Sequence, residues 1–146
     1  MKFSESIEID RPVETVVRLF TNPDHLGQWM DGFQNIEHLS GTPGTQGAKS
    51  RLTFQTGKRK MEMTETITAI DLPKEMSFTY DAGTVFNTVR NRFEKLKENR
   101  TRLVVDTEYR FKGIMKFIAP LMSGVFKKQT RKYLGDFKEF AENQAS

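Results

Sequence analysis

The stretch IEIDRPVETVVRLFTNPDHLGQWMDGF, residues 7–33, contains the local signals that decide the fold. It begins inside KFSESIEID, whose alternation of apolar and polar residues predicts a strand over residues 2–10. Apolar residues at helical spacing between Val13 and Phe20 predict a short amphipathic helix, with Asp10 as its N-cap and Pro12 near its first position. The Asn-Pro-Asp turn then starts a second short helix ending near Trp29. The segment around this single tryptophan is either a catalytic loop or a bent helical piece that closes a hydrophobic space.

The spacing between apolar residues changes twice along the rest of the chain. From Phe33 onward the period is two, and short turn-rich separators predict six further antiparallel strands near residues 34–41, 47–57, 59–70, 75–82, 84–97 and 101–112. From Ile114 to Asn143 apolar residues recur every three or four positions, which predicts one long helix kinked near Pro120. We therefore expect an α+β domain: a curved seven-stranded antiparallel sheet wrapped around a long C-terminal helix, with two short helices after the first strand.

This layout and the opening motif resemble the helix-grip superfamily, which includes START lipid-transfer domains, birch-pollen-allergen-like proteins and the polyketide cyclase/dehydrase family. The resemblance covers the whole chain. Val17 stands where that motif often has tryptophan, and Asp31 stands where it often has proline. The matching positions are Pro12, Val13, Val16, Val17, Phe20, Asp24, Leu26, Trp29, Gly32 and Phe33. The resemblance implies the fold, but the superfamily hosts cyclases, lyases, ligand carriers and chaperone activators.

Length and composition narrow the class of protein. A chain of 146 residues is expected to form one domain, residues 1–146, with a core that needs no cross-links. The absence of cysteine excludes disulfides and thiol catalysis and fits a reducing compartment, so we expect a cytoplasmic protein. The first ten residues do not resemble a signal peptide, and we expect no membrane span because no run of about 18 apolar residues occurs.

The net charge of +4 is unevenly distributed. Residues 1–50 carry 4 Lys or Arg against 7 Asp or Glu, whereas residues 101–146 carry 9 against 5. The basic runs Lys58–Lys60 and Lys127–Lys132 are either solvated surface or a site of transient contact with an anionic membrane surface. We expect no nucleic-acid partner, because the aromatic residues alternate inward instead of flanking exposed basic residues.

Known metal and phosphate motifs are missing. His25 and His38 are 13 positions apart and are too few for a three-ligand zinc site, so we expect no metal. Residues 41–50, GTPGTQGAKS, imitate a phosphate-binding loop, but Pro43 and Ala48 occupy the positions where that loop requires glycine. No dinucleotide fingerprint or nucleophile elbow occurs, and we predict no cofactor.

Alternation predicts which side chains line the concave face of the sheet. That surface is apolar and aromatic with a few isolated polar groups, as small-molecule pockets usually are. A one-residue shift in register would reverse every strand assignment. Glu65 and Tyr109 are weak catalytic candidates, since burial would raise the pKa of a carboxyl group. The predicted cavity residues are Trp29, Phe33, Phe54, Met63, Glu65, Phe78, Tyr80, Asn91, Phe93, Thr107, Tyr109, Leu121, Met122, Val125, Phe126 and Gln129.

Three functions fit this surface. The first is binding or transport of a small hydrophobic molecule, lipid-like or polyketide-like, in an internal cavity. The second is a polyketide cyclase or dehydratase that uses the same cavity and transfers protons through a buried Glu or Tyr. The third is a protein-interaction module that resembles chaperone-ATPase activators and uses its outer charges.

Overall fold

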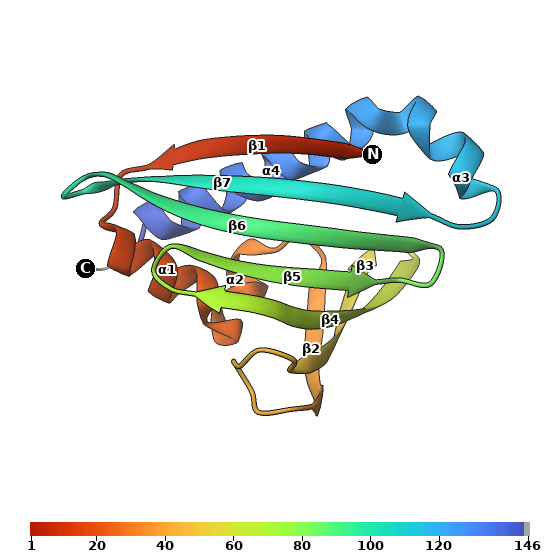
Figure 1. Ribbon diagram of the computed structural model, residues 1–146, viewed down its shortest axis with the longest axis horizontal. Helices are drawn as coiled ribbons and strands as arrows, with labels where there is room; N and C mark the ends of the chain where they lie inside the picture. The colour runs from red at the N-terminus through yellow and green to blue at the C-terminus, as the bar shows by residue number, and fades with distance from the viewer. Residues whose placement is uncertain (145–146) are drawn as a thin grey trace.

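The computed structural model describes residues 1–144, which form one strongly curved antiparallel sheet and a set of helices on its concave side (Figure 1). The strand order is β1-β7-β6-β5-β4-β3-β2, so the meander from β2 to β7 is completed by the first strand. The predicted strands are confirmed to within about two residues at each end. Their bounds are β1 Lys2–Ile9, β2 Phe33–Ser40, β3 Lys49–Thr56, β4 Arg59–Asp71, β5 Glu75–Asp81, β6 Val85–Lys97 and β7 Arg100–Phe111.

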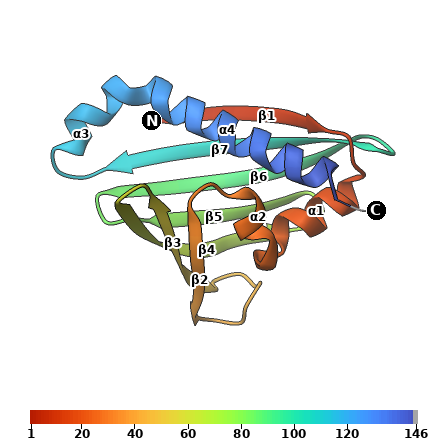
Figure 2. The ribbon, with the colours of Figure 1, turned by 180° about the vertical axis from the view of Figure 1, so that it is seen from behind.

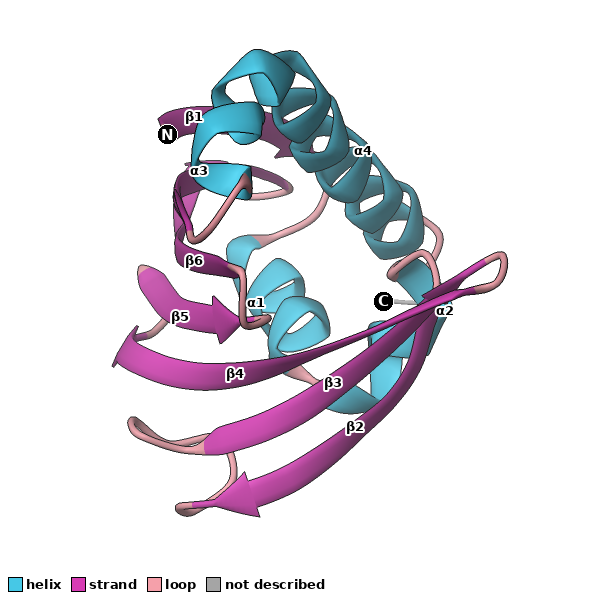
Figure 3. Ribbon diagram, turned by 90° about the vertical axis from the view of Figure 1, so that its right-hand side faces the viewer, coloured by secondary structure: helices cyan, strands magenta, loops and turns pink. Residues whose placement is uncertain are grey.

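Two groups of helices follow the predicted order. The first is α1, Val13–Thr21, followed by a 3-10 turn at Pro23–His25 and by α2, Leu26–Trp29. Pro12, not Asp10, is the N-cap of α1, so the predicted capping residue is wrong. Asp10 instead lies in the turn after β1, where its backbone N–H donates to Glu142. Figure 3 shows the sheet curving around the space that these helices and the C-terminal helix share.

The C-terminal helix is divided, where the sequence predicted one kinked rod. It consists of α3, Met115–Ile118, a 3-10 turn, η2, Ala119–Met122, and α4, Ser123–Glu142. Pro120 lies in the 3-10 turn, where it cannot donate a backbone hydrogen bond. The helix α4 crosses the concave face, whereas α3 lies beyond the end of β7 (Figure 2).

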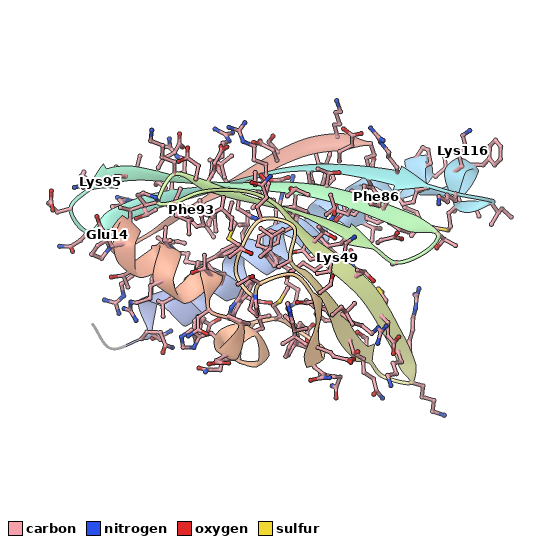
Figure 4. All side chains as sticks on the ribbon, turned by 60° about the horizontal axis from the view of Figure 1, so that its bottom comes forward. Glu14, Lys49, Phe86, Phe93, Lys95 and Lys116 are labelled. Atoms are coloured by element: carbon pink, nitrogen blue, oxygen red, sulfur yellow. The ribbon has the colours of Figure 1, made fainter. Side chains whose placement is uncertain are left out.

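Aromatic side chains form the centre of the core. The Phe20 ring lies 6.0 Å from Trp29, 5.4 Å from Phe93 and 5.2 Å from Phe137, measured between ring centroids. These residues come from α1, α2, β6 and α4, so one cluster joins both short helices, the sheet and the long helix. Figure 4 shows Phe93 beneath the sheet beside α1.

The convex face of the sheet carries paired charges, as alternation predicted. Arg92 Nε donates to Asp106 Oδ2 at 2.8 Å, and Arg90 pairs with Glu75. The Arg92 guanidinium holds the pKa of Asp106 below its usual value. Much of this face therefore consists of solvated ion pairs, and most apolar residues of the strands lie on the concave side.

We predict that Gly32 is required by the turn that leads from α2 into β2. Its φ is +79°, and a Cβ added there would lie 2.8 Å from the backbone oxygen of Gln55. Gly32→Ala is therefore expected to destabilise the fold by more than about 1 kcal/mol, or roughly 3 °C in Tm.

The matched control is Gly135→Ala in α4, where a new Cβ would meet nothing within 4 Å. This change is expected to raise the Tm, because alanine favours a helix interior over glycine by up to about 1 kcal/mol. Thermal denaturation followed by circular dichroism measures both effects. Equal Tm values for Gly32→Ala and the unmodified protein would contradict the prediction.

Candidate functional site on the concave face

The structure places the predicted cavity residues at three different depths. One group is buried in the packed core: Trp29, Phe78, Asn91, Phe93 and Thr107. A second group is half-buried and lines the open part of the concave face: Phe33, Phe54, Met63, Glu65, Tyr80, Tyr109 and Phe126. A third group is exposed: Leu121, Met122, Val125 and Gln129. The predicted residues from the strands thus range from buried to half-buried, whereas four of the five from the C-terminal segment are exposed.

The prediction that the third group lies on the enclosed side of the helix is wrong. Leu121 is 86% exposed and Val125 is 50% exposed, while Met122 and Gln129 are exposed at the rim. The stripe of α4 that faces the sheet instead runs through Phe126, Thr130, Leu134 and Phe137. Leu121 and Met122 lie in the 3-10 turn η2, so the phase of a single α-helix does not apply to them, whereas Val125 and Gln129 lie within α4 beside the stripe that faces the sheet.

The end of the concave face near α1 is filled. Trp29 is 5% exposed, and its ring lies 4.9 Å from Tyr133 and 5.0 Å from Phe137. These contacts place the tryptophan as a wedge between α2 and α4. The interpretation of this segment as one that closes a hydrophobic space therefore agrees with the structure. Two buried polar atoms here, Trp29 Nε1 and Asn91 Oδ1, have no hydrogen-bond partner among the described residues.

A row of polar residues crosses the open half of the concave face. Strand register places Ser50 opposite Glu65, Glu65 opposite Tyr80, Tyr80 opposite Asn87, and Asn87 opposite Tyr109. These five residues, which we call the polar row, run across β3 to β7 with apolar residues on either side. Thr107 donates to Asn87 Oδ1 at 2.6 Å. Directly opposed side chains in a sheet are close enough to act together.

Glu65 is the ionisable group at the middle of this surface. Burial raises the pKa of its carboxyl group above the usual 4.5, and hydrogen bonding with the Tyr80 hydroxyl acts in the opposite direction. Burial also raises the pKa of Tyr80, and the nearby Glu65 carboxylate adds to this effect. A carboxyl group in an apolar wall is more easily protonated than one in water, so Glu65 can both donate and accept a proton.

Two residues of this surface were not among the predicted cavity residues. Tyr133 of α4 reaches the interior, and burial followed by the charge of Glu65 raises the pKa of its hydroxyl. Phe111, at the end of β7, packs 5.4 Å from Phe126 and 6.1 Å from Tyr109. Alternation along β7 places Phe111 on the inward face, and helical spacing does the same for Tyr133. The sequence therefore contained the signal that could have identified both residues.

Two hollows open at the ends of this surface. The first, about 500 Å³, is lined by Met1, Tyr109, Arg110, Phe111, Lys116, Pro120 and Ser123. The second, about 430 Å³, lies between the α2–β2 turn, residues 27–34, and the α4 side chains Lys132 and Asp136. The first hollow adjoins the aromatic contacts of Tyr109 and Phe126, whose rings are 4.9 Å apart. We call the half-buried apolar and aromatic part of the concave face, from Phe33 and Phe54 to Tyr109 and Phe126, the groove.

The described residues contain no cluster of three or more His, Cys, Asp or Glu that could hold a metal ion. His38 Nε2 contacts the backbone oxygen of Gly41 at 2.7 Å, and the His25 ring packs 5.4 Å from Phe140. Both histidines thus have local structural partners. Within residues 1–144 no helix combines the length and apolar character needed to cross a membrane.

Comparison with known families gives one match, which covers residues 1–142. The matching model describes polyketide cyclase / dehydrase and lipid transport proteins. The chain belongs to this family. A comparison with curated proteins found no significant match.

Solved structures similar to this family member share its helix-grip fold. A protein of Thermus thermophilus aligns with a TM-score of 0.80 and 17% identity, covering 100% of both chains. The ZhuI aromatase/cyclase of a Streptomyces species aligns with a TM-score of 0.77 and 15% identity, covering 97% of this chain and 93% of its own. Norcoclaurine synthase of Thalictrum flavum aligns with a TM-score of 0.73 and 15% identity, covering 99% of this chain and 87% of its own.

We predict that Glu65 makes the stability of this family member depend on pH. Because burial raises the pKa in the folded state, the stability due to this group is fully present below about pH 4.5 and is lost as pH rises through the folded-state pKa. Glu65→Gln removes the charge that forms at higher pH. The Tm of the variant relative to the unmodified protein is therefore expected to increase between about pH 4 and pH 8.

Glu62→Gln is the matched control for this measurement. Glu62 lies on the same strand, three residues earlier, on the opposite face and exposed to solvent. The Tm of Glu62→Gln is expected to change with pH in the same way as the Tm of the unmodified protein. A Glu65→Gln variant whose Tm difference stays constant over this range would contradict a buried, proton-binding carboxyl group.

Proposed function

We propose that the groove binds a small hydrophobic molecule, lipid-like or polyketide-like, for sequestration or transport. The observation that carries this proposal is the half-buried aromatic and apolar wall with the polar row across it. Phe33, Phe54 and Met63 on one side and Tyr109 and Phe126 on the other leave apolar surface partly in water. Covering that surface with an apolar ligand is favourable, and the few polar groups would orient it. Membership in a family described by lipid transport is consistent with this function.

The test is the binding of a neutral apolar fluorophore, N-phenyl-1-naphthylamine, together with native mass spectrometry of the purified protein. We expect fluorescence enhancement at one saturable site. Met63→Trp places a larger side chain in the groove, opposite Leu52 of β3 and two residues before Glu65 of the polar row. It is expected to weaken binding by about tenfold or more, equivalent to ~1.4 kcal/mol.

Glu62→Trp is the matched control, because it adds the same indole ring at the adjacent position on the opposite face of β4. It is expected to leave fluorophore binding unchanged. Equal affinity of the two variants, or an unmodified protein that neither binds the fluorophore nor retains a ligand in the native mass spectrum, would overturn the proposed function.

A second candidate is an enzyme of the cyclase or dehydratase kind that uses the same groove. It is favoured by one specific observation, the raised pKa of Glu65 beside the Tyr80 hydroxyl. A neutral carboxyl group can protonate a substrate oxygen, and the resulting carboxylate can remove a proton from the neighbouring carbon. Tyr109, the other catalytic candidate, has a hydroxyl whose pKa is also raised by burial, and it stands at the far end of the polar row.

If the protein is such an enzyme, Glu65→Gln is expected to lower the turnover of a poly-β-ketone substrate by roughly 10²-fold or more while fluorophore affinity is retained. Product formation is followed by mass spectrometry. Tyr80→Phe is the companion variant, since it keeps the ring and removes the hydroxyl. Unchanged turnover in Glu65→Gln would exclude this carboxyl group as the acid or base.

A protein-interaction module remains the third prediction, and no contact that the described residues make on the convex face favours it. There Arg90, Arg92 and Arg102 are paired with Glu75, Asp106 and Glu94 of this chain. Charges already engaged within the sheet give less net attraction for an outside partner.

A further inference from the structure

Large apolar side chains gather on the outside of the molecule between β7 and α4. Of the ten exposed large hydrophobic residues in the described chain, six lie between residues 114 and 125. The most exposed are Ile114 at 73%, Phe117 at 76%, Leu121 at 86% and Val125 at 50%, and we call these four the apolar cap. Contiguous apolar surface of this kind on a globular protein usually marks a place of contact with another molecule or a membrane.

The apolar cap projects from one end of the fold. After Gly113 the chain leaves the end of β7 and forms α3 and η2 beyond the edge of the sheet, before α4 returns across the concave face (Figures 1 and 2). Figure 4 places Lys116 of α3 at the opposite extremity of the molecule from Lys95. The small residue Ala119 is the buried member of this segment, with 0% exposure. The larger side chains therefore face solvent.

Positive charge surrounds the apolar cap. Between Glu108 and Asp136 the sequence contains seven Lys or Arg and no Asp or Glu. Three of the seven, Arg110, Arg131 and Lys132, form ion pairs with Glu108, Glu5 and Asp136 respectively. No ion pair within residues 1–144 involves the other four, Lys112, Lys116, Lys127 and Lys128. The segment thus combines protruding apolar groups with unpaired ammonium groups.

We propose that the apolar cap is a docking surface for anionic lipid bilayers. Phe117 and Leu121 enter the boundary between headgroups and acyl chains, and the four lysines extend to the lipid phosphates. Interfacial binding of this kind depends on buried apolar area together with electrostatic attraction to anionic lipid. Lysine suits this position, because its stem covers apolar surface while its ammonium group stays at the headgroup level.

Charge complementarity favours a bilayer over a second copy of this chain. A symmetric dimer through the cap would bring the same residues of both copies together, so lysines would face lysines with no acidic residue in the segment to pair with them. Nucleic acid is also a poor match. Three of the four cap residues are aliphatic, and the stacking of bases requires aromatic faces.

The apolar cap lies beside the first hollow, which connects docking with ligand binding. Lys116 and Pro120 line the 500 Å³ hollow together with Tyr109 and Phe111, so a docked protein holds this opening of the groove against the bilayer. An apolar ligand could then pass between lipid and groove without crossing water. This last step rests on the proposed ligand-binding function, whereas docking itself does not.

The experiment measures cosedimentation with sucrose-loaded vesicles of phosphatidylcholine alone and of phosphatidylcholine mixed with phosphatidylglycerol. We expect binding to the mixed vesicles and much weaker binding to phosphatidylcholine alone. In Phe117→Trp, the fluorescence of the new indole is expected to shift to shorter wavelength with the mixed vesicles and to be quenched by brominated acyl chains. Buried Trp29 of the unmodified protein supplies the reference spectrum.

Two pairs of variants separate the apolar and electrostatic contributions. Phe117→Ser with Leu121→Ser is expected to abolish binding, whereas Leu72→Ser, at an exposed leucine on the β4–β5 turn, is expected to leave it unchanged. Lys116→Gln with Lys128→Gln is expected to weaken binding about fivefold for each lysine. Lys58→Gln with Lys60→Gln, in the β3–β4 hairpin, is the charge-matched control. Because these positions are exposed, the changes are expected to leave the fold intact, and circular dichroism verifies it.

The experiment distinguishes membrane docking from self-association through the apolar cap. Absence of binding to mixed vesicles, binding that survives the Phe117 and Leu121 changes, or self-association that the same changes abolish would each overturn the docking proposal. Sedimentation velocity measures the last of these. Vesicle binding by a protein that neither binds the fluorophore nor retains a ligand leaves docking in place and overturns only the proposed function. Fluorophore binding without vesicle binding overturns only docking.

Discussion

The packing of Trp29 against the C-terminal helix is the contact on which the rest of the structure depends. Its ring touches Phe137 and Tyr133 of α4 and Phe20 of α1, so one side chain connects both short helices to the helix that covers the sheet. Because these rings fill the space at one end, α4 is held close to the sheet there. At its other end α4 contacts Tyr109 and Phe111 through Phe126, and Arg131 of α4 pairs with Glu5 of β1. Aromatic contacts thus hold α4 against the rest of the fold at both ends of the concave face.

The same arrangement determines the chemistry of the groove. Apolar walls raise the free energy of a charge, which is why the pKa of the Glu65 carboxyl group lies above its usual value. The groups beside it are hydroxyls, Tyr80 and Tyr133, which can donate hydrogen bonds without adding positive charge. A binding protein and a proton-transfer enzyme need much the same surface, and this explains how one family can include both lipid carriers and cyclases.

The sequence predicted those features that depend on the spacing of apolar residues within one strand or helix. Alternation alone placed Thr107 and Tyr109 on the inner face, because a strand has only two faces and one of them must be buried. The polar row could not be predicted, since it depends on the register between five strands, and the bulge at Ile67–Ala69 changes the β4–β5 pairing. Leu121 and Val125 were misplaced for different reasons. Leu121 lies in the 3-10 turn with Pro120, so the phase predicted for a single helix does not apply to it, whereas Val125 lies within α4 but on its exposed side.

The position of the first strand also constrains how the chain reaches this structure. Each residue of β1 pairs with a residue of β7 about 100 positions later, so this edge of the sheet cannot close until β7 has been synthesised. Until then Phe3, Ile7 and Ile9 lack their β7 partners. The meander from β2 to β7 has only short connections and can assemble first, so β1 precedes the meander in the chain but joins the sheet after it.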